Sequence, residues 1–221
     1  MLESYTTIEG TAEAAIVEKK SEFIAAASFV DTEQAALRFL EEVRARHRTA
    51  NHNVYAYLLR QGGRTRYSDD GEPQKTAGLP VLEVLRHSGL TDLIVVVTRY
   101  FGGTLLGTGG LVRAYSGAVQ EGLRSSVILT RQSGVRLEIR TDYTDLGKIQ
   151  YLMGQEQIPT LASDYTDSVY LEALVPVRQL ESFCNALTEG TAGKVSLTKG
   201  DPCDYALNGG ELLLLDKGEP V

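Results

Sequence analysis

A glycine-rich segment in the middle of the chain carries residue types that can bind an anion. Residues 98–115 read TRYFGGTLLGTGGLVRAY and hold five glycines, which are Gly102, Gly103, Gly107, Gly109 and Gly110. They stand between an apolar run and a helical pattern, where free backbone amides and the helix dipole favour negative charge. Arg99 and Arg113 flank these glycines and could add charge-assisted contacts, or each could serve an ion pair, and Tyr100 is included in the candidate site. We therefore predict an anion- or partner-binding site here.

The glycine-rich segment matches neither of the common nucleotide motifs. In the G-x-G-x-x-G frame that begins at Gly107, Val112 stands at the last position, and in the P-loop frame Thr108 stands where lysine is required. Glycines also permit tight turns and close packing of a strand on a helix without any ligand. The sequence leaves both explanations open.

An acidic segment, Ser68 to Gly78, holds three carboxylates within four residues, namely Asp69, Asp70 and Glu72. Hard cations such as Mg²⁺ accept oxygen ligands of this kind when a turn brings them together. The same residues form turns readily, so a solvated or arginine-paired turn is the favoured interpretation. We therefore predict neither a metal nor a cofactor.

Two histidines precede the acidic segment in the chain. His47 and His52 are five residues apart and do not share a helical face, and no cluster of cysteines and histidines completes a zinc site. Either could serve as a general base beside the acidic turn or make an ordinary hydrogen bond. We include His52 in the candidate site.

Hydrophobic periodicity predicts the elements that position these segments. They are a hairpin over Ala12 to Val30, a helix from Asp31 or Thr32 to about His47, strands over Asn53 to Arg60 and Asp92 to Tyr100, and helices over Thr76 to Ser88 and Leu111 to Leu123. The apolar run Leu93 to Val97 is typical of a strand covered on both faces, so this strand should be central in its sheet.

The pattern restarts after Arg131, which predicts two domains, residues 1–133 and residues 134–221. Strands are predicted over Val135 to Thr141, Thr160 to Tyr165, Ser168 to Val175 and Lys194 to Thr198, and helices over Asp145 to Gln157 and Gln179 to Leu187. The order β-α-β-β-α-β is that of a ferredoxin-like split βαβ unit. Leu212 to Leu215 could add an edge strand. The fold class is therefore α+β.

Composition indicates a globular protein in the cytoplasm. A chain of 221 residues often splits into two cores. The apolar runs are far shorter than the roughly 20 residues that cross a bilayer, and the N-terminus lacks the pattern of a secretory signal. Cys184 and Cys203 are too few for a disulfide framework. We predict no membrane contact and reduced thiols.

The net charge of −7 is unevenly spread. Residues 1–133 hold 15 basic and 15 acidic residues, whereas residues 134–221 hold 7 and 14. Arginines cluster in the first domain at Arg38, Arg44, Arg46, Arg48, Arg60, Arg64 and Arg66. Contact with nucleic acid should therefore be confined to the N-terminal domain, because the acidic second half repels phosphate.

Several motifs taken together resemble the signature of the YigZ/IMPACT family. They are Lys19 to Ile24 (KKSEFI), His52, Asp69 to Pro73 (DDGEP), Thr76 to Gly78 (TAG), Arg99 to Gly103 (RYFGG) and Leu106 to Tyr115 (LGTGGLVRAY). The resemblance covers residues 17–125. Glu22 departs from it, because a basic residue is expected there, and this weakens an anion contact at that position.

The resemblance implies a fold and a field of action. The N-terminal domain should be like the second domain of a small-subunit ribosomal protein, a fold also used by elongation factor G and small-molecule kinases. The C-terminal domain should be similar to ferredoxin-like modules of elongation factor G. Eukaryotic relatives are regarded as translation regulators that act by protein contact, although they carry a different partner domain.

Three functions follow from these patterns. The favoured function is a non-enzymatic, translation-associated factor that binds RNA or the translation machinery through its N-terminal domain. A module that recruits a protein partner through the acidic C-terminal domain ranks with it. The alternative is an enzyme that binds phosphate or a nucleotide at Gly102 to Gly110 with Mg²⁺ on the acidic turn. The proposed site requires the amides after Arg99 to lie close to the carboxylates around Gly71.

Overall fold

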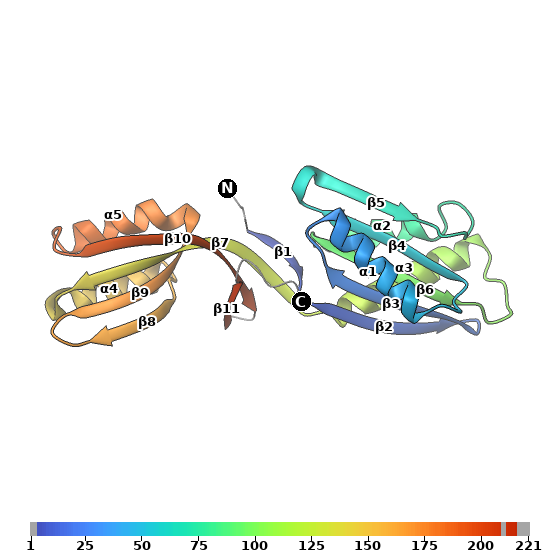
Figure 1. The fold of residues 1–221 in the computed structure, drawn as a ribbon, viewed down its shortest axis with the longest axis horizontal. Coiled ribbons are helices and arrows are strands. Elements are labelled where there is room, and N and C mark those ends of the chain that lie inside the picture. The colour runs from blue at the N-terminus through green and yellow to red at the C-terminus, as the bar shows by residue number, and fades with distance from the viewer. Residues whose placement is uncertain (1–3, 209–210, 216–221) are drawn as a thin grey trace. The chain divides into compact units, whose positions relative to one another are not determined.

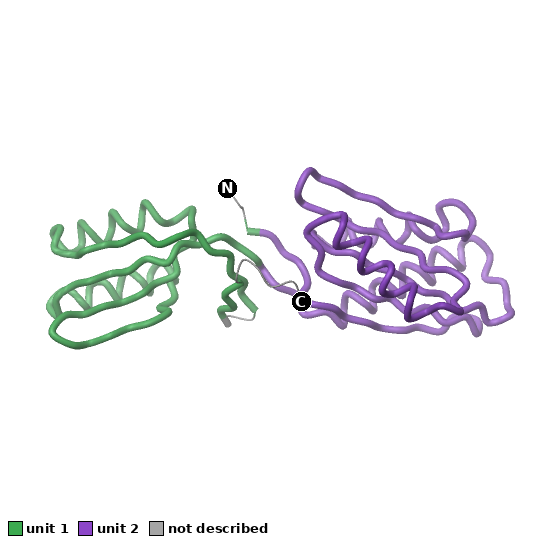
Figure 2. The backbone as a smooth tube through the Cα atoms, in the orientation of Figure 1, with its two compact units in different colours: residues 1–4, 131–220 green, residues 5–130, 221 purple. Residues whose placement is uncertain are grey.

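The computed structural model describes residues 4–208 and 211–215 as two compact units (Figures 1 and 2). The N-terminal unit comprises residues 5–130, and the C-terminal unit comprises Ser4 and the described residues from Arg131 onward. Each unit combines helices with a β-sheet, which confirms the α+β class. None of the helices in these described ranges has the length and apolar character required to span a bilayer.

An antiparallel sheet with the strand order β2-β3-β6-β4-β5 forms the N-terminal unit. Its strands are β2 (Thr11–Glu18), β3 (Ser21–Phe29), β4 (His52–Leu59), β5 (Arg64–Ser68) and β6 (Leu93–Tyr100). The prediction that the strand around Leu93 to Val97 is central is confirmed, because β6 is the middle strand and these residues are fully buried. A short 3-10 turn, η1 (Gln61–Gly63), joins β4 to β5.

Helices cover both faces of this sheet. Helix α1 (Glu33–Arg46) packs on one face, whereas α2 (Gly78–Ser88) and α3 (Thr108–Arg124) pack on the other. In Figure 1, α1 crosses in front of the strands, while α2 and α3 lie behind them. Successive residues of β6 therefore alternate between two apolar cores, which explains why the whole strand is apolar.

A long-range hydrogen bond and the N-termini of two helices position further parts of this unit. Strand β1 (Tyr5–Ile8) is held by the Thr7 hydroxyl, which donates to the Asp92 carbonyl at 3.2 Å. Thr32 caps α1, because its hydroxyl accepts from the Ala35 amide at 3.2 Å. Helix α3 begins at Thr108, three residues earlier than predicted, so Gly109 and Gly110 lie in its first turn and not in a loop.

The C-terminal unit is a sheet with the strand order β11-β10-β7-β9-β8. Its elements are β7 (Ile128–Thr141), whose residues 128–130 belong to the N-terminal unit, α4 (Tyr143–Gln155), β8 (Thr160–Tyr165), β9 (Val169–Pro176), η2 (Val177–Gln179), α5 (Leu180–Gly190), β10 (Ser196–Asn208) and β11 (Glu211–Leu215). The β-α-β-β-α-β order and the edge strand at Leu212 to Leu215 are both confirmed. Both α4 and α5 contribute to one apolar core with β7 and β9, where Cys184 lies as a buried free thiol.

Candidate functional site

A cavity of about 480 Å³ lies between the acidic segment and the glycine-rich segment of the N-terminal unit. We call it the site cavity. It is lined by Asn51, His52, Glu72, Pro73, Arg99, Phe101, Leu105, Leu106, Gly107, Thr108 and Leu111. The two segments therefore border the same cavity, although α2 and most of β6 separate them in the chain.

Asp69 is fully engaged in building the loop that leads into α2. Its carboxylate accepts from the amides of Lys75 at 2.9 Å, Ala77 at 3.1 Å and Gly78 at 2.8 Å. These amides stand at the beginning of the helix, where no intrahelical acceptor is available. Asp69 therefore stabilises α2 and does not line the site cavity.

Asp70 joins the acidic segment to α1 and β4. Its carboxylate accepts from the Arg44 guanidinium at 3.1 Å and from the Asn53 amide at 2.6 Å. Its carbonyl oxygen lies 2.8 Å from Nδ1 of His52. Because a carbonyl only accepts, Nδ1 carries the proton, and Nε2 of neutral His52 is left with a lone pair. His52 lines the site cavity, so this nitrogen is a candidate acceptor or, when protonated, a donor there.

Glu72 forms a buried ion pair in the wall of the cavity. Its Oε1 atom accepts from Nη1 of Arg99 at 2.6 Å and from the Tyr115 hydroxyl at 2.7 Å, and it lies 3.9 Å from Nε2 of His52. Glu72 is 8% exposed and Arg99 is 5% exposed. Burial and the Glu72 carboxylate raise the pKa of Tyr115, so its hydroxyl remains a donor. Nε of Arg99 is buried and has no partner among the described residues.

These contacts decide the role of the acidic segment. Asp69, Asp70 and Glu72 bind protein donors and do not converge on one open space. Across residues 4–208 and 211–215, no group of three His, Cys, Asp or Glu side chains comes together as metal ligands would. The segment is the arginine-paired turn that the sequence favoured.

The first part of the glycine-rich segment is held against β3 and β4. The Gly102 amide donates to the Ser21 hydroxyl at 3.1 Å, and the Phe101 amide donates to the Asn51 side chain at 2.8 Å. A Cβ atom on Gly102 would collide with the Lys20 carbonyl, so only glycine fits there. Close backbone packing therefore explains this glycine without a ligand.

The second part of the segment leaves backbone donors open. Gly107 precedes α3 with a positive φ of 72°, and its carbonyl accepts from the Leu111 amide at 3.0 Å. Within the described residues, the amides of Thr108, Gly109 and Gly110 have no acceptor. Because Gly107 has no side chain, it cannot cap these amides. The start of α3 is thus an uncapped set of donors next to the cavity.

Other predicted site residues lie outside the cavity. Arg113 is exposed on α3, and Tyr100 donates or accepts at 3.0 Å with Nδ1 of His47. Gly103 is exposed in the loop with a φ of 80°. Conversely, sequence reasoning did not single out the apolar wall, which consists of Pro73, Phe101, Leu105, Leu106 and Leu111. All of them except Leu105 fall within the motifs quoted above, but their types and spacing did not indicate that they form one wall.

The arginine cluster is largely neutralised by carboxylates, most of which come from distant segments. Five of its seven arginines form ion pairs: Arg44 with Glu41 and Asp70, Arg46 with Glu13, Arg60 with Asp92, and Arg64 and Arg66 with Glu33. The local count of charges therefore overstated the positive character of this surface. The Tyr57 hydroxyl and Arg66 hydrogen-bond Glu33 and lower its pKa, which keeps this carboxylate ionised.

Each unit of the chain matches a family of known proteins. Residues 19–123 match the Impact N-terminal domain, and residues 139–194 match the Domain of unknown function (DUF1949). The chain is 40% identical to IMPACT family member YvyE of Bacillus subtilis, over 91% of this chain and 93% of that protein. The chain belongs to the IMPACT family. All residues that line the site cavity fall inside the Impact N-terminal match.

Further members of the IMPACT family show how far the similarity extends. IMPACT family member YigZ of Escherichia coli is 37% identical, over 81% of this chain and 89% of its own. The Protein IMPACT homolog of Saccharomyces cerevisiae is 33% identical, over 44% of this chain and 39% of its own. A solved structure described as a crystal structure of an hypothetical protein superposes with a TM-score of 0.59 at 34% identity, covering 89% of this chain and 97% of that one.

Proposed function

We propose that this IMPACT-family member is a non-enzymatic, translation-associated binding protein of the cytoplasm that holds a phosphate group of RNA in the site cavity. One observation carries the proposal: the open amides of Thr108, Gly109 and Gly110 belong to the first turn of α3, which begins at Thr108, and Thr108 lines the cavity together with His52, Glu72 and Arg99. Amides at a helix start, together with the helix dipole, favour an anion such as phosphate.

The walls of the cavity support an RNA ligand over a bare anion. Phe101 and Leu105 line it and are exposed to solvent. Exposed aromatic rings contribute base stacking in proteins that bind single-stranded nucleic acid. A phosphate at the start of α3 and a base against Phe101 would therefore use both kinds of surface that the cavity offers.

The charge pattern limits the size of this contact. Because most of the clustered arginines are paired with carboxylates, an extended basic track for many phosphates is not supported. We expect RNA binding through few phosphates, and therefore a shallow dependence of affinity on salt concentration.

The folds of the two units favour an association with translation. In the C-terminal unit, β7 and β9 are antiparallel neighbours and β10 lies on the other side of β7, which supports the assignment to a ferredoxin-like fold. Such modules occur in elongation factor G, and the resemblance of the N-terminal unit to a ribosomal protein domain points the same way. Fold analogy supports a field of action but no specific partner.

The enzymatic alternative has less support. An enzyme with Mg²⁺ on the acidic turn would need open carboxylates, and those of Asp69, Asp70 and Glu72 are bound by protein donors. A partner protein on the acidic C-terminal unit stays a separate hypothesis.

Substitution of Thr108 by aspartate tests the RNA proposal. Fluorescence anisotropy would measure binding of a labelled single-stranded RNA at several salt concentrations. In Thr108→Asp, a carboxylate at the first residue of α3 suits the helix dipole and preserves folding, but it repels a phosphate at the same amides. We expect the affinity to fall at least about tenfold, which corresponds to about 1.4 kcal/mol.

Two variants serve as controls for this experiment. Thr108→Asn changes the side chain without the charge and should bind RNA like the unmodified protein. Gln34→Asp places the same charge in the first turn of α1, on the opposite face of the sheet, and should also leave binding unchanged. Absence of RNA binding at low salt, or equal affinity in Thr108→Asp, contradicts the proposal.

A further inference from the structure

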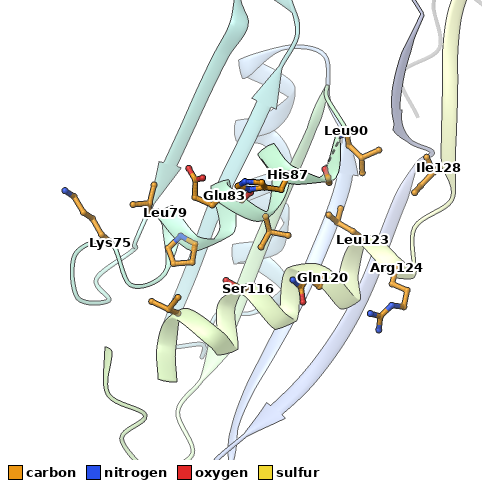
Figure 3. A pocket seen from close by; sticks show the side chains of 14 residues that line it. Lys75, Leu79, Glu83, His87, Leu90, Ser116, Gln120, Leu123, Arg124 and Ile128 are labelled. Carbon is orange, nitrogen blue, oxygen red and sulfur yellow. Dashed lines mark hydrogen bonds between the residues drawn. The ribbon is translucent and has the colours of Figure 1, made fainter. Parts of the chain in front are cut away.

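A second concave surface lies between α2 and α3, and it shares no residue with the site cavity. It has a volume of about 820 Å³ and is shown in Figure 3. We call it the helix groove. It is lined by Lys75, Leu79, Pro80, Glu83, Val84, His87, Ser88, Leu90, Val112, Ser116, Gln120, Leu123, Arg124 and Ile128.

Two rows of side chains with four-residue spacing form the walls. On α2 the row is Leu79, Glu83 and His87, and on α3 it is Val112, Ser116, Gln120 and Arg124. Figure 3 labels members of both rows along the two helices that border the groove, namely Leu79, Glu83 and His87 on α2 and Ser116, Gln120 and Arg124 on α3. Residues four apart build ridges on a helix, and the space between two ridges is the shape into which another helix packs.

The groove presents apolar side chains to solvent. Val112 and Ile128 line it and are exposed, and the adjacent Val127 is exposed as well. Half-buried Leu79 and Val84 add to the apolar lining, and apolar side chains gathered in one concave surface indicate an interaction site. Because the groove is open on one side, an acyl chain bound in it would still expose part of its apolar surface to water, which is unfavourable. An amphipathic helix would bury only its apolar face and keep its polar face hydrated.

The charges at the groove determine which helix it suits. The only carboxylate among the lining residues, Glu83, is paired with Arg86 at 2.8 Å. Arg124 is paired with Glu121, whereas the Lys75 side chain has no partner within the described residues. The unpaired charge at the groove is therefore positive and lies at its Lys75 end.

We propose that the helix groove docks an amphipathic helix of a protein partner, with acidic residues flanking its apolar stripe at the end over Lys75. The inference is independent of RNA binding, because the two surfaces have no residue in common.

A pair of synthetic peptides provides the probe. Each peptide is an amphipathic helix with leucines at positions i, i+3, i+4 and i+7, and the flanking residues are glutamate in one peptide and lysine in the other. Binding to the full chain would be mapped by amide chemical shifts and quantified by anisotropy. We expect shifts on α2 and α3, and an affinity for the acidic peptide at least about fivefold higher than for the basic one, about 1 kcal/mol.

Matched variants distinguish binding in the groove from non-specific binding of the peptide elsewhere on the protein. Val112→Gln removes apolar surface from the groove without adding charge and should weaken the acidic peptide at least about tenfold. Leu37→Gln makes a comparable change on α1, because Leu37 is 39% exposed and Val112 is 38% exposed, and it should have no effect. Lys75→Glu should reverse the preference between the two peptides.

Three results would overturn the proposal. The first is the absence of shifts on α2 and α3 with either peptide. The second is an equal loss of affinity in Val112→Gln and Leu37→Gln, which would indicate non-specific association. The third is occupation of the groove by a simple carboxylate amphiphile such as decanoate that the peptides cannot displace, because the ligand would then be an acyl chain.

Discussion

The two segments that face each other across the site cavity use their polar groups in opposite ways. On the acidic side, the carboxylates of Asp69, Asp70 and Glu72 are bound by amides, arginines and a tyrosine of the same unit. On the glycine side, the amides of Thr108 and Gly109 have no acceptor in the described chain. The charged side chains of the acidic segment therefore stabilise the fold, whereas the uncharged glycine-rich segment leaves backbone amides available to a ligand.

The difference has a physical cause. A buried carboxylate without a partner is costly, so folding recruits donors to it from wherever the chain offers them. The first amides of a helix have no intrahelical acceptor by geometry, and a glycine at the cap position supplies none. At α3 that glycine is Gly107, so the donors stay available to a ligand.

The largest expected loss in the free energy of unfolding comes from a substitution of Glu72 in the acidic segment. In Glu72→Gln, the Arg99 guanidinium loses its carboxylate while it stays buried. Removal of one partner of a buried ion pair costs about 3–5 kcal/mol, because the remaining charge is uncompensated. Denaturation with urea should show this loss in the free energy of unfolding.

A control variant tests whether the loss of stability in Glu72→Gln depends on burial of the carboxylate. Glu22→Gln is the same change at an exposed carboxylate of β3 and should alter stability by less than about 0.5 kcal/mol. If Glu72→Gln were no more destabilising than Glu22→Gln, the pair would not be the structural anchor described here.

A smaller effect is expected at Asp69. In Asp69→Asn, the side-chain oxygen can still accept from Ala77 and Gly78, but the new amide group faces the Lys75 amide, and two donors then oppose each other. We expect a loss of about 2 kcal/mol in the free energy of unfolding. RNA affinity of the folded protein should not change, because Asp69 does not line the cavity. A parallel loss of affinity would mean that the acidic side contacts the ligand.

The sequence predicted those features that depend on local pattern. The apolar run Leu93 to Val97 identified the central strand, and the periodicity after Arg131 identified the β-α-β-β-α-β order. Strand β5 was missed, because its residues Arg64 to Ser68 carry no apolar alternation and are mostly exposed. Only its pairing with β4 makes this segment a strand.

Those site residues could be predicted that stand in recognisable short motifs. His52, Glu72 and Arg99 were predicted and line the cavity. The ion pairs that neutralise the arginines were not predictable, because Glu13 and Glu33 are distant in sequence from Arg46 and Arg66. Local charge counts do not contain that information, since it depends on which strands and helices become neighbours.

The smallest expected loss of stability comes from substitutions of Gly103 in the glycine-rich segment. Gly103 has a φ of 80°, and nothing lies within 4 Å of a Cβ atom placed on it. Gly103→Ala should therefore cost only the strain of a left-handed backbone, about 1 kcal/mol. Gly103→Asn should cost less than alanine, because asparagine tolerates this conformation better. Gly102→Ala is the contrasting variant, because its Cβ would collide with the Lys20 carbonyl. Urea denaturation would rank the three variants, and a loss for Gly103→Ala as large as that for Gly102→Ala would show that the loop is as tightly packed as the segment before it.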